Sequence, residues 1–272
     1  MKNMNIACYC VDFDNYDFLY EIVDNLRFAK VGVELSMFSD KLEYMKELLE
    51  QKDRFAEFPV TFHGPYMEVE ATSDLESEEH KKMIKAYEEA FRVYKKFGAD
   101  SIVMHTNQRG FTEEERSTFQ KNAIKTIKEI ALMAEKENIN LLVENVGETV
   151  YGNLLFDEEE FIKLFEQLPE NTGCLIDIGH AIINQWDLEK VVTSLKHKIR
   201  SYHLHSNDGK DDIHRPLFEE GRLLPPDKLK QFIACIEENT PDADWILEYA
   251  PGEHITTELI VDEVKRLRSI MP

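Results

Sequence analysis

The 272-residue sequence contains no apolar run that approaches the roughly 18 residues a membrane-spanning helix needs. Its first residues, Met1 to Ile6, lack the apolar core and small-residue cleavage site of a secretion signal. The four cysteines form no CxxC pair, and two of them lie in apolar runs typical of strands. We therefore expect a cytoplasmic protein without a membrane partner, whose cysteines are buried free thiols rather than disulfides.

Positive charge and chain-breaking residues are also scarce. Lysine and arginine number 32 against 53 acids, so the net charge is −21 and the chain would repel a nucleic-acid backbone unless a local basic patch intervened. Small ligands suit this charge better than nucleic acid does. The 11 glycines and 9 prolines form no linker, and we expect residues 1–272 to be a single domain.

What the sequence does contain is a series of eight short apolar segments. They lie near residues 6–9, 31–35, 60–63, 101–105, 141–144, 174–177, 201–205 and 245–248. They run without strict alternation of apolar and polar residues, which is the pattern of parallel strands covered on both faces. Amphipathic stretches separate them. The clearest, Glu78 to Phe97, has apolar residues at three- and four-residue spacing opposite Lys, Glu and Arg.

Further helices are expected between the other apolar segments. They lie near residues 16–25, 41–52, 112–133, 157–168, 187–195, 227–238 and 255–270. Eight alternations of strand and helix, in a chain near the roughly 250 residues usual for the fold, predict an α/β protein built as a single (β/α)8 TIM barrel. The longest irregular stretches each follow a strand, on the side where the catalytic loops of such a barrel gather.

Acids and histidines stand at the ends of the apolar segments. The clearest four are Glu144, Asp177, His205 and Glu248, from four different predicted strands. Because an unpaired buried charge is strongly unfavourable, a cation would offset the cost of burying three carboxylates together. Three carboxylates and one imidazole suit a divalent ion, with Zn²⁺ or Mn²⁺ favoured and Co²⁺ or Mg²⁺ also suitable.

Other histidines end neighbouring segments. His63 and His105 end the third and fourth predicted strands, where their imidazoles would complete a second metal site beside a bridging Glu144. His203 lies two residues before His205 and points to the same side of the strand at a different depth. We interpret His203 as a supporting group rather than a ligand.

Three more candidate ligands lie beyond the strands. His180 follows Asp177 by three residues, in a turn from strand to helix. Asp212 and His214 lie in the long stretch 206–226, which is long enough to fold back over the barrel mouth. With these residues included, the sequence predicts one to three bound ions.

The candidate residues belong to short motifs. These are His63-Gly64-Pro65-Tyr66, His105-Thr106-Asn107, Glu144-Asn145, Asp177-Ile178-Gly179-His180-Ala181, His203-Leu204-His205-Ser206-Asn207-Asp208-Gly209, Asp212-Ile213-His214 and Leu247-Glu248. From about Val60 to Tyr249 the chain resembles the xylose isomerase-like TIM-barrel superfamily, which contains sugar phosphate isomerases and epimerases together with endonuclease IV. The resemblance implies a common metal site made of the four strand-end residues named above.

The endonuclease IV branch implies more. Its three-zinc arrangement corresponds here to one metal at His63, His105 and Glu144, a second at the four strand-end residues with Glu144 shared, and a third at His180, Asp212 and His214. Sugar isomerase-like members can also carry the Asp-x-x-His element of Asp177 and His180 and the Asp-x-His element of Asp212 and His214, so the motifs leave the reaction open.

The first hypothesis for function is a divalent-metal-dependent isomerase or epimerase acting on a sugar or sugar phosphate. The resemblance implies that Glu144 and Glu248 act as acid and base as well as ligands. His180, Arg215 and Glu34 are the candidate substrate contacts. The specific sugar, its phosphorylation and the oligomeric state stay open.

Two other hypotheses belong to different classes. One is an endonuclease IV-like zinc-dependent phosphodiester hydrolase acting on abasic DNA, which the acidic loops 68–74 and 208–212 disfavour because they would repel DNA. The other is a metal-binding barrel without turnover that serves as a ligand sensor, which the retained pair Glu144 and Glu248 disfavours.

Overall fold

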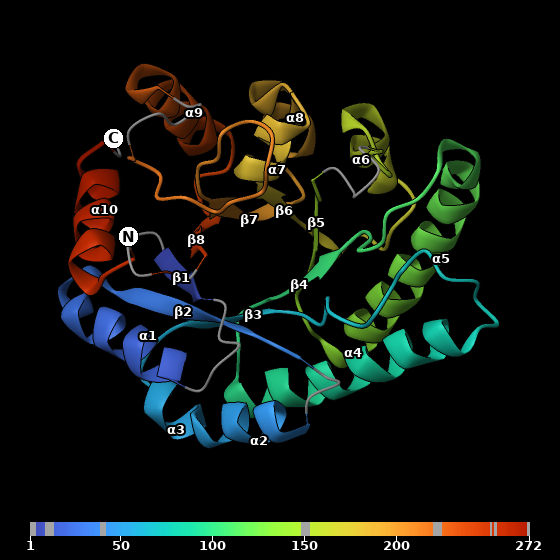
Figure 1. The fold of residues 1–272 in the computed structure, drawn as a ribbon, viewed down its shortest axis with the longest axis horizontal. Helices are drawn as coiled ribbons and strands as arrows, with labels where there is room; N and C mark the ends of the chain where they lie inside the picture. The colour runs from blue at the N-terminus through green and yellow to red at the C-terminus, as the bar shows by residue number, and fades with distance from the viewer. Residues whose placement is uncertain are drawn as a thin grey trace.

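The computed structural model describes residues 4–8, 14–38, 42–147, 153–219, 225–250, 252 and 255–270. Within them, eight parallel strands close into a barrel in which each strand pairs with the next along the chain and β8 pairs with β1 (Figure 1). The strands are β1 (Met4–Cys8), β2 (Val31–Ser36), β3 (Val60–His63), β4 (Ile102–His105), β5 (Leu141–Glu144), β6 (Gly173–Asp177), β7 (Ile199–Leu204) and β8 (Asp244–Tyr249). The predicted (β/α)8 barrel is confirmed.

Helices surround the strands, as Figure 1 shows. They are α1 (Asp14–Asn25), α2 (Leu42–Glu50), α3 (Lys52–Phe55), α4 (Glu78–Phe97), α5 (Glu113–Glu137), α6 (Glu158–Leu164), α7 (Ile178–Ile183), α8 (Leu188–Leu195), α9 (Pro226–Asn239) and α10 (Thr257–Ile270), with a short 3-10 helix at Arg27–Ala29. The bounds of α4 equal the predicted ones. Ser77 caps its first turn by accepting from the backbone N–H of His80, and Gly98 ends it with φ of 67°.

Several elements differ from the sequence-based expectation, most clearly three of them. The helix expected over 41–52 is divided into α2 and α3. Helix α7 was not predicted, because six residues are too few to display an apolar period. It starts directly after β6, where the Asp177 carboxylate accepts from the backbone N–H of His180 at 2.7 Å. Strand β7 ends at Leu204, so His205 follows the strand instead of ending it.

The alternation of side chains along the strands divides the core in two. The large core lies between the sheet and its helices, while Val103, Leu142, Leu175 and Ile246 form a separate buried cluster. Their chain neighbours belong to the large core, so these four side chains point into the barrel. They form an apolar layer inside it, as is usual for this fold.

Two expectations from the sequence concern membranes and thiols. No described helix is both long and apolar enough to cross a membrane. Cys174 is a buried free thiol in β6, and Cys235 is a half-buried free thiol in α9. Cys10 and the side chain of Cys8 lie outside the described residues.

Candidate metal centre

The candidate site lies one layer above the apolar cluster inside the barrel. His105, Glu144, Asp177 and Glu248 each lie two residues after a member of that cluster, on β4, β5, β6 and β8. Because side chains on a strand alternate with a period of two, all four point into the barrel at its carboxyl end. The period that builds the core therefore also gathers the polar residues.

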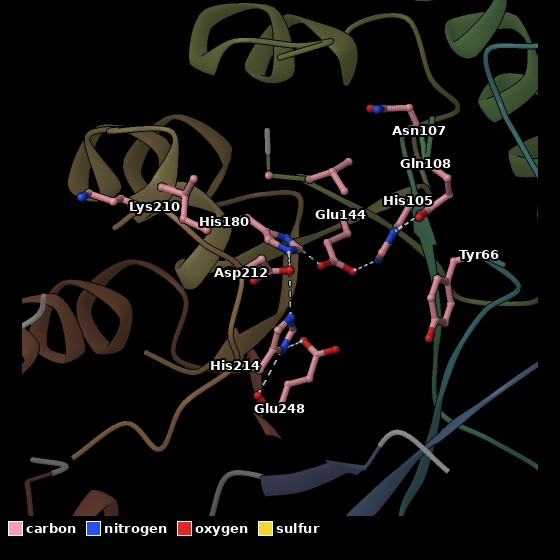
Figure 2. A pocket seen from close by; sticks show the side chains of 13 residues that line it. Tyr66, His105, Asn107, Gln108, Glu144, His180, Lys210, Asp212, His214 and Glu248 are labelled. Atoms are coloured by element: carbon pink, nitrogen blue, oxygen red, sulfur yellow. Dashed lines mark hydrogen bonds and ion pairs between the residues drawn. The ribbon is translucent and has the colours of Figure 1, made fainter. Parts of the chain in front are cut away.

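Glu144 stands at the centre of this layer, as Figure 2 shows. Its Oε2 lies 3.2 Å from Nε2 of His105 and 3.8 Å from Nε2 of His63, and the two imidazole nitrogens are 3.0 Å apart. Its Oε1 faces the other way, 3.4 Å from Nδ1 of His180 and 3.5 Å from Nδ1 of His203. One carboxylate thus lies between two groups of imidazoles.

The second group lies around Asp177. Nε2 of His205 is 3.0 Å from both carboxylate oxygens of Asp177, and its ring stacks on His214 with centroids 4.0 Å apart. Nδ1 of His203 lies 2.8 Å from Oε2 of Glu248 and 3.7 Å from Oδ2 of Asp177. Both His203 and His205 are buried. The structure therefore brings His203 as close to the carboxylates as His205, which the sequence-based interpretation did not anticipate.

The third group is held by the loop after β7. An antiparallel bridge between Ser206 and Arg215 closes this loop and turns it back over the barrel. Oδ2 of Asp212 then lies 3.1 Å from Nε2 of His180 and 3.0 Å from Nε2 of His214 (Figure 2). All nine residues predicted as ligands fall into four groups, and within each group the donor atoms lie within 4.8 Å of one another. The four predicted core ligands are divided between two of these groups: Glu144 and Asp177 group with His203, and His205 and Glu248 group with His214.

The donor chemistry suits a divalent cation. Among the described residues, no side chain or backbone group forms a well-aligned hydrogen bond with either buried oxygen of Glu144. Burying such a carboxylate costs several kcal/mol unless a partner compensates, and here its neighbours are imidazole nitrogens, which share its ability to bind a metal. Ligands of zinc lie about 2.0–2.2 Å from the ion, which places neighbouring donor atoms about 3.3 Å apart, close to the spacings observed here.

Attraction between acids and imidazoles shifts the pKa values of several groups in the site. Burial alone would raise the pKa of Glu144, but attraction to His105 and His203 lowers it well below the usual range. In the same way, burial would raise the pKa of Glu248, but attraction to His203 and His214 lowers it to about 2. The pKa of His214 is raised to about 9 against burial, mainly by Glu248 and by its hydrogen bond to Asp212.

Not every histidine is affected in the same direction. Burial, followed by repulsion from His105, lowers the pKa of His63. Burial would also lower the pKa of His180, but Asp177 and Asp212 raise it well above its ordinary value. Without a cation the centre is thus a network of ion pairs, which a metal would replace by displacing protons.

Two residues predicted as substrate contacts lie elsewhere. Glu34 is buried beneath the site, where its carboxylate accepts from Oγ1 of Thr61 and from Nε2 of His203, both at 2.9 Å, and it does not line the cavity. Arg215 is exposed, with its guanidinium 3.7 Å from Glu219, and it is likewise absent from the cavity lining. His180, the third predicted contact, does line the cavity.

The cavity above the candidate metal centre has a volume of about 250 Å³. Its wall includes Tyr66, Asn107, Gln108 and Lys210, to which the sequence analysis gave no role. Tyr66 and Asn107 were present in the motifs around His63 and His105 without an assigned function. Gln108 follows them in sequence, and its side-chain amide contacts Nδ1 of His105. Tyr66, Asn107 and Gln108 come shortly after a strand that carries a candidate ligand, and this position could have identified them as cavity residues. Lys210 has no such signal.

Comparison with known proteins gives a family and a set of similar folds. A family described as xylose isomerase-like TIM barrel matches residues 20–270. No curated protein matches the chain in a sequence search.

Several solved structures share the fold. A D-tagatose 3-epimerase-like protein is 19% identical, with a TM-score of 0.74 over 99% of this chain and 97% of that one. The TTHB071 protein from Thermus thermophilus, soaked with ZnCl2, is 18% identical, with a TM-score of 0.71 over 99% and 98%. The IOLI protein with a bound zinc atom is 16% identical, with a TM-score of 0.73 over 99% and 98%. At these identities the likeness concerns the fold.

Proposed function

Because this chain belongs to the xylose isomerase-like TIM barrel family, we propose that it is a divalent-metal-dependent isomerase or epimerase of a sugar or sugar phosphate. The observation that carries the proposal is the pair Glu144 and Glu248. These carboxylates lie on β5 and β8, are buried, and line the same cavity of about 250 Å³, which can hold a monosaccharide. The structural similarity to a D-tagatose 3-epimerase-like protein supports the same class of reaction.

In this proposal the chain supplies groups that move a proton. Glu144 and Glu248 are held ionised, which is the state that can accept a proton from a carbon beside a carbonyl group. One of them removes the proton and the other returns one to the opposite face or to the neighbouring carbon. When bound, a divalent ion would hold two adjacent sugar oxygens and make the carbon-bound proton more acidic. Tyr66 and Gln108 are placed to orient the sugar from the cavity wall.

The residues proposed to hold the metal are Glu144, Asp177, His205 and Glu248. The groups formed by His63 with His105 and by His180 with Asp212 and His214 would hold additional ions, so we propose one to three per chain. Zinc or manganese is the proposed metal, with cobalt or magnesium as substitutes. The zinc atom bound in the IOLI structure supports a zinc-compatible fold, and the TTHB071 protein was soaked with ZnCl2.

The proposal is tested by hydrogen exchange. Metal-loaded protein is incubated in D2O with a panel of free and phosphorylated ketoses, and NMR follows deuterium entering the carbon next to the carbonyl. We expect exchange with at least one sugar, a loss of about 10²-fold or more in Glu248→Gln, and no change in Asp211→Asn, an exposed acid outside the cavity lining. Metal-loaded protein that exchanges no deuterium into any sugar would contradict the proposal and favour a ligand sensor.

A second function is favoured by one observation. The structure gathers the donors that the endonuclease IV resemblance implies into adjacent groups on either side of Glu144. Against hydrolysis of DNA stands the scarcity of phosphate-binding side chains in the cavity, whose described lining has three carboxylates and, besides histidines, one lysine, Lys210. Nicking of an abasic-site duplex by zinc-loaded protein, abolished in Glu144→Gln, would replace the isomerase proposal by this one.

A further inference from the structure

A column of buried polar side chains runs beneath the candidate metal centre. Nδ2 of Asn5 on β1 donates to Oγ1 of Thr61 on β3 at 3.2 Å, and Thr61 donates to Oε2 of Glu34 on β2 at 2.9 Å. Oε1 of Glu34 lies 2.9 Å from Nε2 of His203 on β7. All four residues are at most 1% exposed. Such a chain costs stability unless each member is satisfied, so its polar groups call for a specific role.

The column fixes which nitrogen of His203 faces the centre. An ionised carboxylate only accepts hydrogen bonds, and the second oxygen of Glu34 is already occupied by Thr61. Nε2 of His203 therefore carries the proton that Glu34 accepts. Nδ1 then faces the candidate metal centre, where it lies 2.8 Å from Glu248, 3.5 Å from Glu144 and 3.7 Å from the Asp177 carboxylate. These separations bracket the roughly 3.3 Å expected between two ligand atoms of one zinc ion.

We propose that Glu34 is a positioning residue that holds His203 so that its Nδ1 becomes a metal ligand beside Glu144 and Glu248. A carboxylate bonded to the far nitrogen of a metal-binding imidazole fixes both its tautomer and its ring orientation. This inference rests on the metal centre of the proposed function but not on its sugar chemistry. It gives Glu34 a role in place of the substrate contact predicted from sequence, since Glu34 is buried and does not line the cavity.

His203 and His205 then serve different neighbours. His205 faces Asp177 with Nε2 and stacks on His214, toward the loop after β7. His203 lies deeper, between Glu34 on one side and Glu248 on the other. Loss of the carboxylate partner of a metal-binding histidine commonly weakens metal binding about 10- to 100-fold. We expect that loss for Glu34→Gln, which keeps the size of the side chain but removes its charge.

The experiment measures zinc affinity without using catalysis. Metal-free wild type, Glu34→Gln, Thr61→Val and Tyr202→Phe are titrated with Zn²⁺ in competition with a chromophoric chelator. Tyr202→Phe is the matched control, because Tyr202 is the buried residue before His203 and loses one hydrogen bond, 2.8 Å long, to Thr240. We expect weakening of about 10- to 100-fold for Glu34→Gln, a smaller loss for Thr61→Val, and less than about twofold change for Tyr202→Phe.

Imidazole ¹⁵N NMR supplies a readout that a merely structural role would not move. Zinc is expected to shift Nδ1 of His203 while its Nε2 keeps the proton. Equal affinities of wild type and Glu34→Gln, an equal loss in Tyr202→Phe, or zinc bound through Nε2 would overturn the proposal. Should Glu34→Gln fail to fold, Thr61→Val and the wild-type spectrum decide the matter. Zinc binding that depends on Glu34 in a protein without sugar exchange would refute the proposed function and leave this inference intact.

Discussion

Gly179 allows a direct test of how tightly the centre is packed. It is the second residue of α7, and a β-carbon there would lie 1.9 Å from Cε1 of His205 and 2.5 Å from each nitrogen of that ring. Carbon atoms in contact settle about 3.5–4.0 Å apart, so the imidazole would have to move by about 2 Å. Misplacing a functional group by about 1 Å can cost about 10²-fold in rate. We therefore expect Gly179→Ala to lose at least about 10²-fold in metal affinity and in sugar exchange.

A control variant with a similar loss of stability separates this clash from a general defect. Alanine in place of glycine in a helix normally stabilises by about 0.5–1 kcal/mol, whereas overpacking a core costs about 1–3 kcal/mol. The control is Gly98→Ala, where φ is 67° and an added β-carbon meets nothing within 4 Å. Its left-handed backbone should cost about 1–2 kcal/mol without touching the centre. Urea unfolding and chelator competition are measured on both variants, and wild-type metal affinity in Gly179→Ala would refute the reasoning.

Two further predictions concern stability. In metal-free protein the pKa of His214 is raised to about 9, above the value of about 6.5 for an unfolded histidine. The ion pairs of His214 should therefore stabilise the fold fully below about pH 6.5, and this contribution should fall as the pH rises toward 9. Urea unfolding of the wild type and of His214→Gln, both with a chelator, is measured at about pH 6 and pH 9. A difference in unfolding free energy between the two proteins that is the same at both pH values would contradict the prediction. Glu263→Gln should cost about 1–3 kcal/mol, because its buried carboxylate accepts from the backbone of Leu217 and Phe218 and from the Tyr249 hydroxyl. The free energy of unfolding of Glu263→Gln is compared with that of Glu238→Gln, a control at an exposed acid of α9. Equal stability of the two variants would contradict the prediction.

Much of the fold was predictable because the barrel repeats one pattern. Apolar runs without alternation identify buried parallel strands, and a period of two fixes which side chains point inward once one of them is known. Glu144 and Glu248 could therefore be placed at the inner ends of β5 and β8 from their positions in sequence alone. Helix α4 could be bounded to the residue, since Ser77 and Gly98 are strong signals for a start and a stop.

The roles of His203 and His205 could not be separated in this way. Both point to the same side of the chain, and which one stands level with Asp177 depends on the register between β6 and β7. That register shifts between Cys174 and Leu175, and it pairs Asp177 with His203. A β-bulge of this kind has no clear signal in the sequence.

Glu34 and Arg215 show two other limits. An acid at a strand end looks the same in sequence whether it faces a ligand or another buried side chain, and Glu34 faces His203. Arg215 is a predicted substrate contact in the loop after β7, and its backbone pairs with Ser206 while its side chain lies outside the cavity lining. Loop geometry of this kind depends on pairings between residues distant in the loop, which residue type does not specify.

The central claim is that the buried carboxylates and imidazoles around Glu144 bind a divalent metal. Elemental analysis of the metal content per chain tests this claim most directly. Protein loaded with zinc or manganese and passed through a desalting column should retain one to three ions per chain. Glu144→Gln, which alters the carboxylate between both groups of imidazoles, should retain fewer. Wild-type protein that is folded and retains no metal under these conditions would contradict the account.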